Sequence, residues 1–149
     1  MPRIPPPVYL LAGLVTQRAL VPEARAGRLG TAAAAALAAG SVGLLASADV
    51  AFHRHATTIN PLDPAKASAI VTDGPFRFTR NPMYVGMAGL LAAHAVRRGG
   101  LLPLLPVAAF VGVIDHLQIA AEERALADKF AGEYEAYLNR VPRWLGPPR

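Results

Sequence analysis

Long runs of apolar residues, separated by short charged loops, are the feature that most limits how this chain can fold. Residues 29–52 and 101–121 are each long enough to cross a bilayer core, which takes about 20 apolar residues in a helix. Two shorter apolar runs, residues 5–20 and 83–96, flank them in the sequence. The pattern predicts an all-α, polytopic membrane protein with about four transmembrane helices.

Composition supports this class and excludes others. Charged residues make up 17% of the chain, against about 25% in soluble domains, which is too few to cover a globular surface. The length of 149 residues predicts a single domain, and the absence of cysteine excludes disulfides and thiol catalysis. The net charge of +5 is scattered between apolar runs, so nucleic acid is not an expected partner.

The first apolar run has two interpretations. As a signal peptide, Arg3 would form the basic region, residues 8–15 the apolar region, and residues 24–26 the cleavage site. A membrane span is favoured, because Arg18 lies near the end of the run, where a long side chain can reach the head groups.

The last segment, residues 122–144, changes character and predicts a C-terminal amphipathic helix. Its apolar residues recur at helical spacing between charges: Leu126, Phe130, Tyr134, Tyr137 and Val141. We expect this helix to lie on the membrane or beneath the bundle, with Trp144 at the membrane interface.

The distribution of Lys and Arg predicts the orientation. With four spans, ten basic residues fall on the side of the N-terminus, the 53–81 loop and the C-terminal tail, and five fall on the opposite side. The richer side is expected to be cytoplasmic. This places the protein in a cytoplasmic membrane, of bacterial type, with both termini in the cytoplasm.

Two polar clusters on that side could carry chemistry. In the segment 74–86, Pro82 can begin a helix, which places Arg80 and Asn81 at a helix N-terminus. That arrangement favours a carboxylate or a phosphate as the ligand, although the arginines of this segment could instead contact lipid phosphates. Glu122 and Glu123 end the fourth run. They could accept hydrogen bonds from a ribose diol, pair with arginine, or only mark the lipid boundary.

Other titratable residues favour structural roles. His94, Asp115 and His116 lie within the apolar runs, and we expect them to hydrogen-bond one another between the third and fourth helices. His53 and His55 could form a metal pair, but a basic membrane-surface segment is favoured. We therefore expect no metal site.

The clusters together resemble the isoprenylcysteine carboxyl methyltransferase family and its relatives among phospholipid N-methyltransferases. The resemblance rests on four stretches: ATTINP at 56–61, GPFRFTRNPMYVG at 74–86, EER at 122–124 and FAGEYEAYLNRVPRW at 130–144. Asn81 stands where many members have histidine. Asparagine does not titrate near neutral pH, which puts an acid–base role at this position in doubt.

The resemblance implies a membrane methyltransferase that uses S-adenosylmethionine, with a cofactor site mainly from residues 74–145. It implies Arg80 and Glu123 as catalytic residues. The implied cofactor-binding residues are Asn81, Pro82, Tyr84, Gly86, Glu122, Tyr134, Tyr137 and Arg140.

The implied acceptor is lipid-like, such as the carboxylate of a prenylcysteine-like molecule, and the alternative is a phospholipid amine. From a different class, a non-catalytic membrane scaffold or transporter subunit stays open. The sequence leaves the acceptor and the oligomeric state undecided.

Overall fold

A computed structural model describes residues 4–57 and 67–146 of the chain. Within these residues every regular element is helical. They are α1 (Pro6–Leu20), α2 (Arg28–Arg54), the short 3-10 helix η2 (Gly74–Arg77), α3 (Pro82–Arg98), α4 (Leu104–Val113), the π-helical turn η3 (Ile114–Ile119) and α5 (Ala120–Arg140). The predicted all-α fold is confirmed, and helices occupy all four apolar runs.

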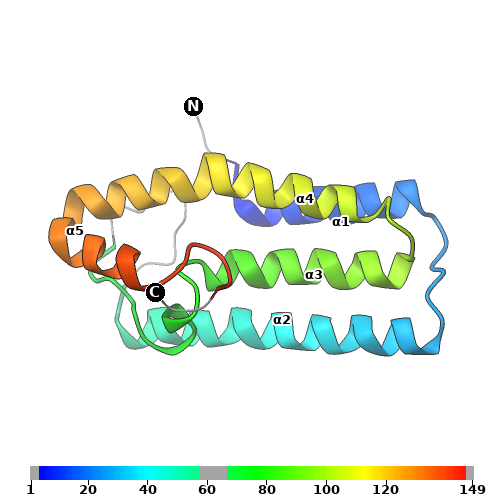
Figure 1. The fold of residues 1–149 in the computed structure, drawn as a ribbon, viewed down its shortest axis with the longest axis horizontal. Helices are drawn as coiled ribbons and strands as arrows, with labels where there is room; N and C mark the ends of the chain where they lie inside the picture. Colours follow the sequence, from blue (N-terminus) through cyan, green and yellow to red (C-terminus); the bar gives the residue numbers. More distant parts are fainter. Residues whose placement is uncertain (1–3, 58–66, 147–149) are drawn as a thin grey trace.

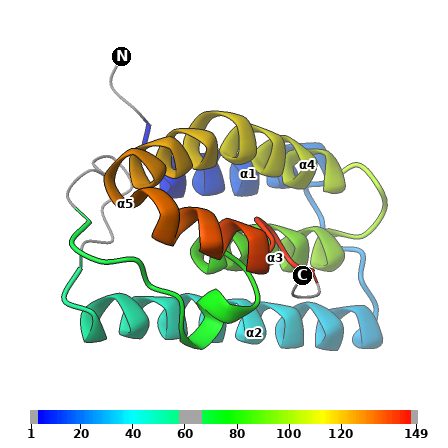
Figure 2. The ribbon, with the colours of Figure 1, turned by 60° about the vertical axis from the view of Figure 1, so that its left-hand side comes forward.

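Helices α1 to α4 run side by side, with α3 in the centre (Figure 1). Helix α2 covers one side of α3, and α1 and α4 cover the other, as the turned view also shows (Figure 2). The α1–α2 and α3–α4 loops meet at one end of the bundle. We call it the remote end, because the site described below lies at the other.

Small residues let α2 and α3 approach closely. A Cβ atom built on Gly86 would lie 2.7 Å from Cγ of Leu45, and one on Gly89 would collide with the Ser41 hydroxyl. Helices that associate in lipid commonly meet through such small residues. Gly86 therefore serves the contact between α2 and α3.

The C-terminal helix predicted from Glu122 is present as α5, which begins at Ala120 and ends at Arg140, and no break separates it from the apolar run before it. Helix α4, the π-helical turn and α5 form one continuous run, because no proline or glycine follows Gly112 until Gly132 and alanine, leucine and glutamate favour helix. The bend comes instead at Ala131, whose φ of 40° and ψ of −119° are not helical. Beyond it the chain turns back toward the start of α3 (Figure 2).

Two helices among the described residues are long and apolar enough to cross a membrane, namely Arg28–Arg54 and the run Leu104–Arg140. Helices α1 and α3 have 15 and 17 residues, short of the roughly 20 that a bilayer core requires. Among the described residues, α2 and the run from α4 to α5 therefore qualify as membrane spans, and four transmembrane helices are not confirmed.

The predicted apolar stripe of the C-terminal segment is part of a core. Tyr134, Tyr137 and Val141 are buried together with Phe76 and residues of α2, and Leu126 and Phe130 pack against them. Trp144 is partly buried and packs against a second core cluster, which includes Leu91 and Phe110.

The expected contact between His94 and the Asp115–His116 pair is absent. His94 Nδ1 lies 2.7 Å from Oε1 of the buried Gln17 on α1, whereas Asp115 bonds to Arg143 and Trp144. The chain after Val141 occupies the space beside Asp115, so this carboxylate meets partners that are distant in sequence.

Candidate functional site

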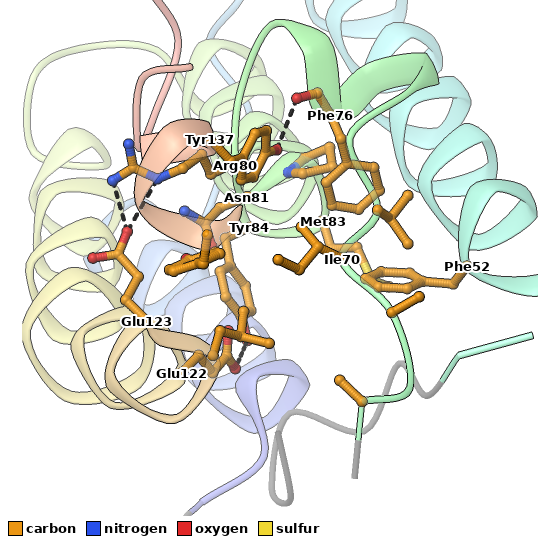
Figure 3. Close-up of a pocket in the computed structure, with 16 residues that line it drawn as sticks. Phe52, Ile70, Phe76, Arg80, Asn81, Met83, Tyr84, Glu122, Glu123 and Tyr137 are labelled. Atoms are coloured by element: carbon orange, nitrogen blue, oxygen red, sulfur yellow. Dashed lines mark hydrogen bonds and ion pairs between the residues drawn. The ribbon is translucent and has the colours of Figure 1, made fainter. Parts of the chain in front are cut away.

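A pocket lies where the end of α2, the segment 67–82, the first turn of α3 and both halves of α5 meet (Figure 3). Its cavity volume is about 130 Å³. One wall is polar and the other is apolar and aromatic. The lining residues are Phe52, Ala67, Ala69, Ile70, Val71, Phe76, Arg80, Asn81, Pro82, Met83, Tyr84, Glu122, Glu123, Leu126, Tyr134 and Tyr137.

Arg80 and Glu123 form the centre of the polar wall. Nε and Nη2 of Arg80 donate to the same carboxylate oxygen of Glu123, at 3.2 and 2.7 Å. The side chains are only 11% and 14% exposed, so the pair is largely withdrawn from water. Nη1 of Arg80 donates to the carbonyl oxygens of Leu138 and Val141, at 3.3 and 2.6 Å, which fixes the guanidinium plane.

Glu122 is held separately from Glu123. The Tyr84 hydroxyl donates to Oε1 of Glu122 at 2.5 Å, and the amide of Gln118, one turn earlier in the helix, donates to the same oxygen at 2.6 Å. Tyr84 comes from the first turn of α3. The two neighbouring carboxylates are therefore oriented by different elements, and both face the pocket (Figure 3).

Residues 141–144, which we call the C-terminal strap, lie across the polar wall. The backbone N–H of Arg80 donates to the carbonyl of Pro142 at 2.9 Å. The carbonyl of Arg143 accepts from the Thr79 hydroxyl at 3.1 Å and from the Asn81 amide at 2.9 Å. These bonds attach the strap to the loop before α3, and they give Asn81 a defined orientation.

The side chain of Arg143 is a second cation on Glu123. Nη2 donates to Oε2 at 2.5 Å and Nε to Oε1 at 3.2 Å, and Nη1 reaches Oδ2 of Asp115 at 3.1 Å. The other oxygen of Asp115 accepts from Nε1 of Trp144 at 2.8 Å. The hydrogen bonds to Glu123 raise the pKa of Arg143 above its ordinary value, so the guanidinium is charged at every relevant pH.

The apolar wall is formed by aromatic rings and aliphatic side chains. Phe52 of α2 meets Phe76 of η2 edge to face, with ring centroids 5.1 Å apart. The Tyr137 hydroxyl donates to the carbonyl of Phe76 at 2.8 Å, which ties α5 to the segment before α3. This wall gives the pocket a surface for flat or hydrocarbon groups next to its carboxylates.

The structure brings together eight of the ten residues that the resemblance implies. Arg80, Asn81, Pro82, Tyr84, Glu122, Glu123, Tyr134 and Tyr137 all line the pocket. Gly86 packs under α2 instead, and Arg140 is exposed and donates to the carbonyl of Ala136 on its own helix.

Sequence reasoning missed Arg143, Asp115 and Thr79 as parts of the site. The motif RVPRW contains Arg143, but spacing alone does not show that the chain bends at Ala131 and returns to Glu123. The one sequence signal of a returning segment is the apolar stripe that continues to Val141, whose residues are buried in the structure.

Comparison with known proteins shows the family of the chain. The sequence pattern of the phospholipid methyltransferase family matches residues 28–133, which include α2, α3, Arg80 and both pocket glutamates. An uncharacterized protein of Haemophilus influenzae is 41% identical over 63 residues, which is 42% of this chain and the whole of that protein. No solved structure matches the chain. Since the match covers more than half of its length, the chain belongs to the phospholipid methyltransferase family.

Proposed function

We propose that the protein is an S-adenosylmethionine-dependent methyltransferase of the membrane that acts on a lipid-like acceptor. One observation carries this proposal: two oriented carboxylates and a fixed arginine share a pocket with an aromatic wall, at one end of an apolar helical bundle. The family supports the reaction class, and the apolar helices support a membrane setting.

The chemistry of the pocket fits the cofactor. S-adenosylmethionine carries a sulfonium cation, a ribose diol and a flat purine. Glu122 and Glu123 can accept hydrogen bonds from hydroxyl or ammonium groups, and aromatic rings such as Tyr84 and Phe76 attract cations and stack on flat rings. With one arginine and two glutamates among its lining residues, the pocket is net negative, which suits a cationic ligand.

The cofactor, when bound, supplies a methyl group already activated for displacement. The protein must then place donor and acceptor in line and keep water out. The buried tyrosines and the strap enclose the polar wall. Glu122 and Glu123 would hold the hydroxyl or amino groups of the cofactor, and Asn81 would add a wall fixed by its bond to the Arg143 carbonyl.

Arg80 and Arg143 bind the Glu123 carboxylate in different ways. Arg143 engages both oxygens of the carboxylate, whereas Arg80 engages one. A ligand carboxylate could therefore take the place of Glu123 at Nε and Nη2 of Arg80 while Arg143 stays as the cationic partner of Glu123. We propose Arg80 as the residue that orients an anionic group of cofactor or substrate.

The proposed acceptor is a carboxylate on a lipid-like molecule, because a carboxylate needs no general base before methyl transfer. A phospholipid amine is the second candidate, favoured by the description of the family. It must first lose a proton, which Glu122 or Glu123 would have to accept.

Lipid extract incubated with methyl-labelled cofactor separates the two acceptors. We expect the label to enter the lipid fraction as a methyl ester. Mild alkali should then release the label from the lipid, because it hydrolyses methyl esters. Label that survives alkali and stays on an amine would establish the second candidate. A non-catalytic scaffold would show neither product and would not bind S-adenosylhomocysteine.

We further propose that all four helices lie within the membrane, with the pocket end in the cytoplasm. The proposal follows from the ten-to-five division of basic residues and from the packing of α1 and α3 alongside α2 and α4. Reporters fused after Gly100 and after Trp144 should report opposite sides. Two reporters on the same side would contradict this topology.

A further inference from the structure

The remote end of the bundle carries an uncompensated positive charge. Arg18, Arg25, Arg28, Arg97 and Arg98 all belong to its two loops or the adjoining helix ends. Glu23 is the single acidic residue in these segments, and the other acidic residues of the chain fall between positions 49 and 135. This concentration of arginine has no part in the pocket described above.

Backbone hydrogen bonds hold the two loops together. The N–H of Arg25 donates to the carbonyl of Arg98 at 3.1 Å, and that of Ala26 to the carbonyl of Arg97 at 3.4 Å. Nη1 of Arg98 reaches the carbonyl of Pro22 at 2.8 Å. The two loops therefore lie together at one end of the bundle, seen at the right of Figure 1, and bring their arginines to that end.

These arginines have no carboxylate partner among the described residues. Arg98 bonds only to neutral acceptors, the carbonyls of Val21 and Pro22 and Nε2 of His94. No ion pair within residues 4–57 and 67–146 involves the other four, and Arg18, Arg25 and Arg28 are exposed. Guanidinium groups in this state are available to an anion.

An apolar groove between α1 and α4 begins at the same end. Its lining consists almost entirely of apolar and small residues: Tyr9, Ala12, Gly13, Thr16, Leu20, Leu105, Pro106, Ala109, Phe110 and Val113. The cavity volume is about 440 Å³. Leu20 and Leu105 stand at its basic end, beside the α1–α2 and α3–α4 loops. The groove therefore runs from a cationic surface along the side of an apolar bundle.

We propose that the remote end binds an anionic phospholipid, with its phosphate at the arginines and one acyl chain in the α1–α4 groove. Charge complementarity selects the headgroup, because arginine pairs with phosphate through two parallel hydrogen bonds. The groove selects a long hydrocarbon chain. This site is separate from the methyl-transfer pocket and does not depend on the proposed function.

Thermal unfolding of the full chain in neutral detergent tests the proposal. Phosphatidylglycerol should raise the unfolding midpoint, and phosphatidylcholine with the same chains should not. In the double variant Arg25→Gln, Arg97→Gln, the phosphatidylglycerol concentration that gives half of this rise should increase roughly tenfold. This is the scale of one lost charged hydrogen bond. The matched control is Arg77→Gln, Arg124→Gln, which removes two arginines near the pocket end and should respond like the wild type.

A second variant tests the groove. Ala109 is exposed and lines it, so Ala109→Phe should fold and should fill the space for an acyl chain, lowering the response to phosphatidylglycerol. Glycerol phosphate, which has the anion without the chains, should stabilise much less. The proposal is overturned if both lipids act equally, if the two double variants respond alike, or if glycerol phosphate matches the lipid.

Discussion

The two ends of this bundle use arginine in opposite ways. At the pocket end the largely buried Arg80 and the partly exposed Arg143 both pair with one carboxylate, Glu123, and each also bonds elsewhere. At the remote end Arg18 and Arg25 are exposed and meet no carboxylate among the described residues. The first arrangement fixes geometry, and the second leaves charge available to a ligand.

The difference has an energetic consequence. A charge removed from water is costly unless it is paired and hydrogen-bonded, and breaking such a pair leaves an uncompensated ion. An exposed arginine loses little hydration and contributes little to stability. Substitutions at the two ends should therefore differ in size and in what they affect.

The largest expected effect is from Glu123→Gln. It removes the anion between Arg80 and Arg143 and leaves two guanidinium groups facing each other. The free energy of unfolding should fall by about 3 kcal/mol, the usual scale for breaking a buried pair. Denaturant unfolding in detergent measures this, with Glu135→Gln, an exposed glutamate of the same helix, as control. Equal stability in both variants would show that the pair does not organise this end.

Arg80→Lys should lower the rate of methyl transfer by roughly tenfold or more, the scale of one lost charged hydrogen bond. Lysine keeps the charge but lacks the planar guanidinium, whose N–H groups donate hydrogen bonds to Glu123, Leu138 and Val141.

Arg77→Lys, three residues earlier and exposed, is the matched control for Arg80→Lys and should behave like the wild type. The assay follows labelled methyl groups into membrane lipid or a prenylcysteine analogue, at equal amounts of folded protein. Wild-type rates for Arg80→Lys would show that its guanidinium has no part in methyl transfer.

Tyr84→Phe should have a smaller effect. It removes the hydroxyl that donates to Glu122 at 2.5 Å, while the Gln118 amide still holds the same oxygen. We expect S-adenosylhomocysteine to bind several-fold more weakly, in line with about 1 kcal/mol for one hydrogen bond. Tyr9→Phe, on α1 outside the pocket, provides the control. An unchanged dissociation constant for Tyr84→Phe would show that the hydrogen bond from Tyr84 to Glu122 does not contribute to cofactor binding.

The smallest effect on stability should come from Arg25→Gln in lipid-free detergent. Its side chain makes no ion pair within the described residues, so the free energy of unfolding should change by less than about 0.5 kcal/mol. A drop comparable to that of Glu123→Gln would show that the remote end is held by arginine contacts, and the contrast between the ends would disappear.

Hydropathy and residue pattern predicted much of this fold. Each of the four apolar runs corresponds to one of the helices α1 to α4, as the hydropathy pattern predicted. The predicted C-terminal helix is present as α5, and its first residues follow α4 and the π-helical turn without a break. Helix propensity depends on backbone and rotamer freedom rather than on polarity, so the helix continued to Ala131.

The candidate site was predictable where residues lie in compact motifs and not where the chain returns from a distance. Arg80, Tyr84 and Glu123 meet as the motifs indicate. Arg143 reaches Glu123 only because of the bend at Ala131, and Asp115 is satisfied by that same returning segment. Such contacts depend on tertiary geometry that residue spacing does not encode.

The most direct test of the central claim is calorimetric titration of S-adenosylhomocysteine into the wild type, Glu122→Gln and Arg97→Gln. If the pocket holds the cofactor, the wild type binds one molecule per chain. Glu122→Gln should then bind at least tenfold more weakly, the scale of one charged hydrogen bond, and Arg97→Gln, at the remote end, should match the wild type. No binding by the wild type, or the same affinity in all three proteins, would contradict the claim.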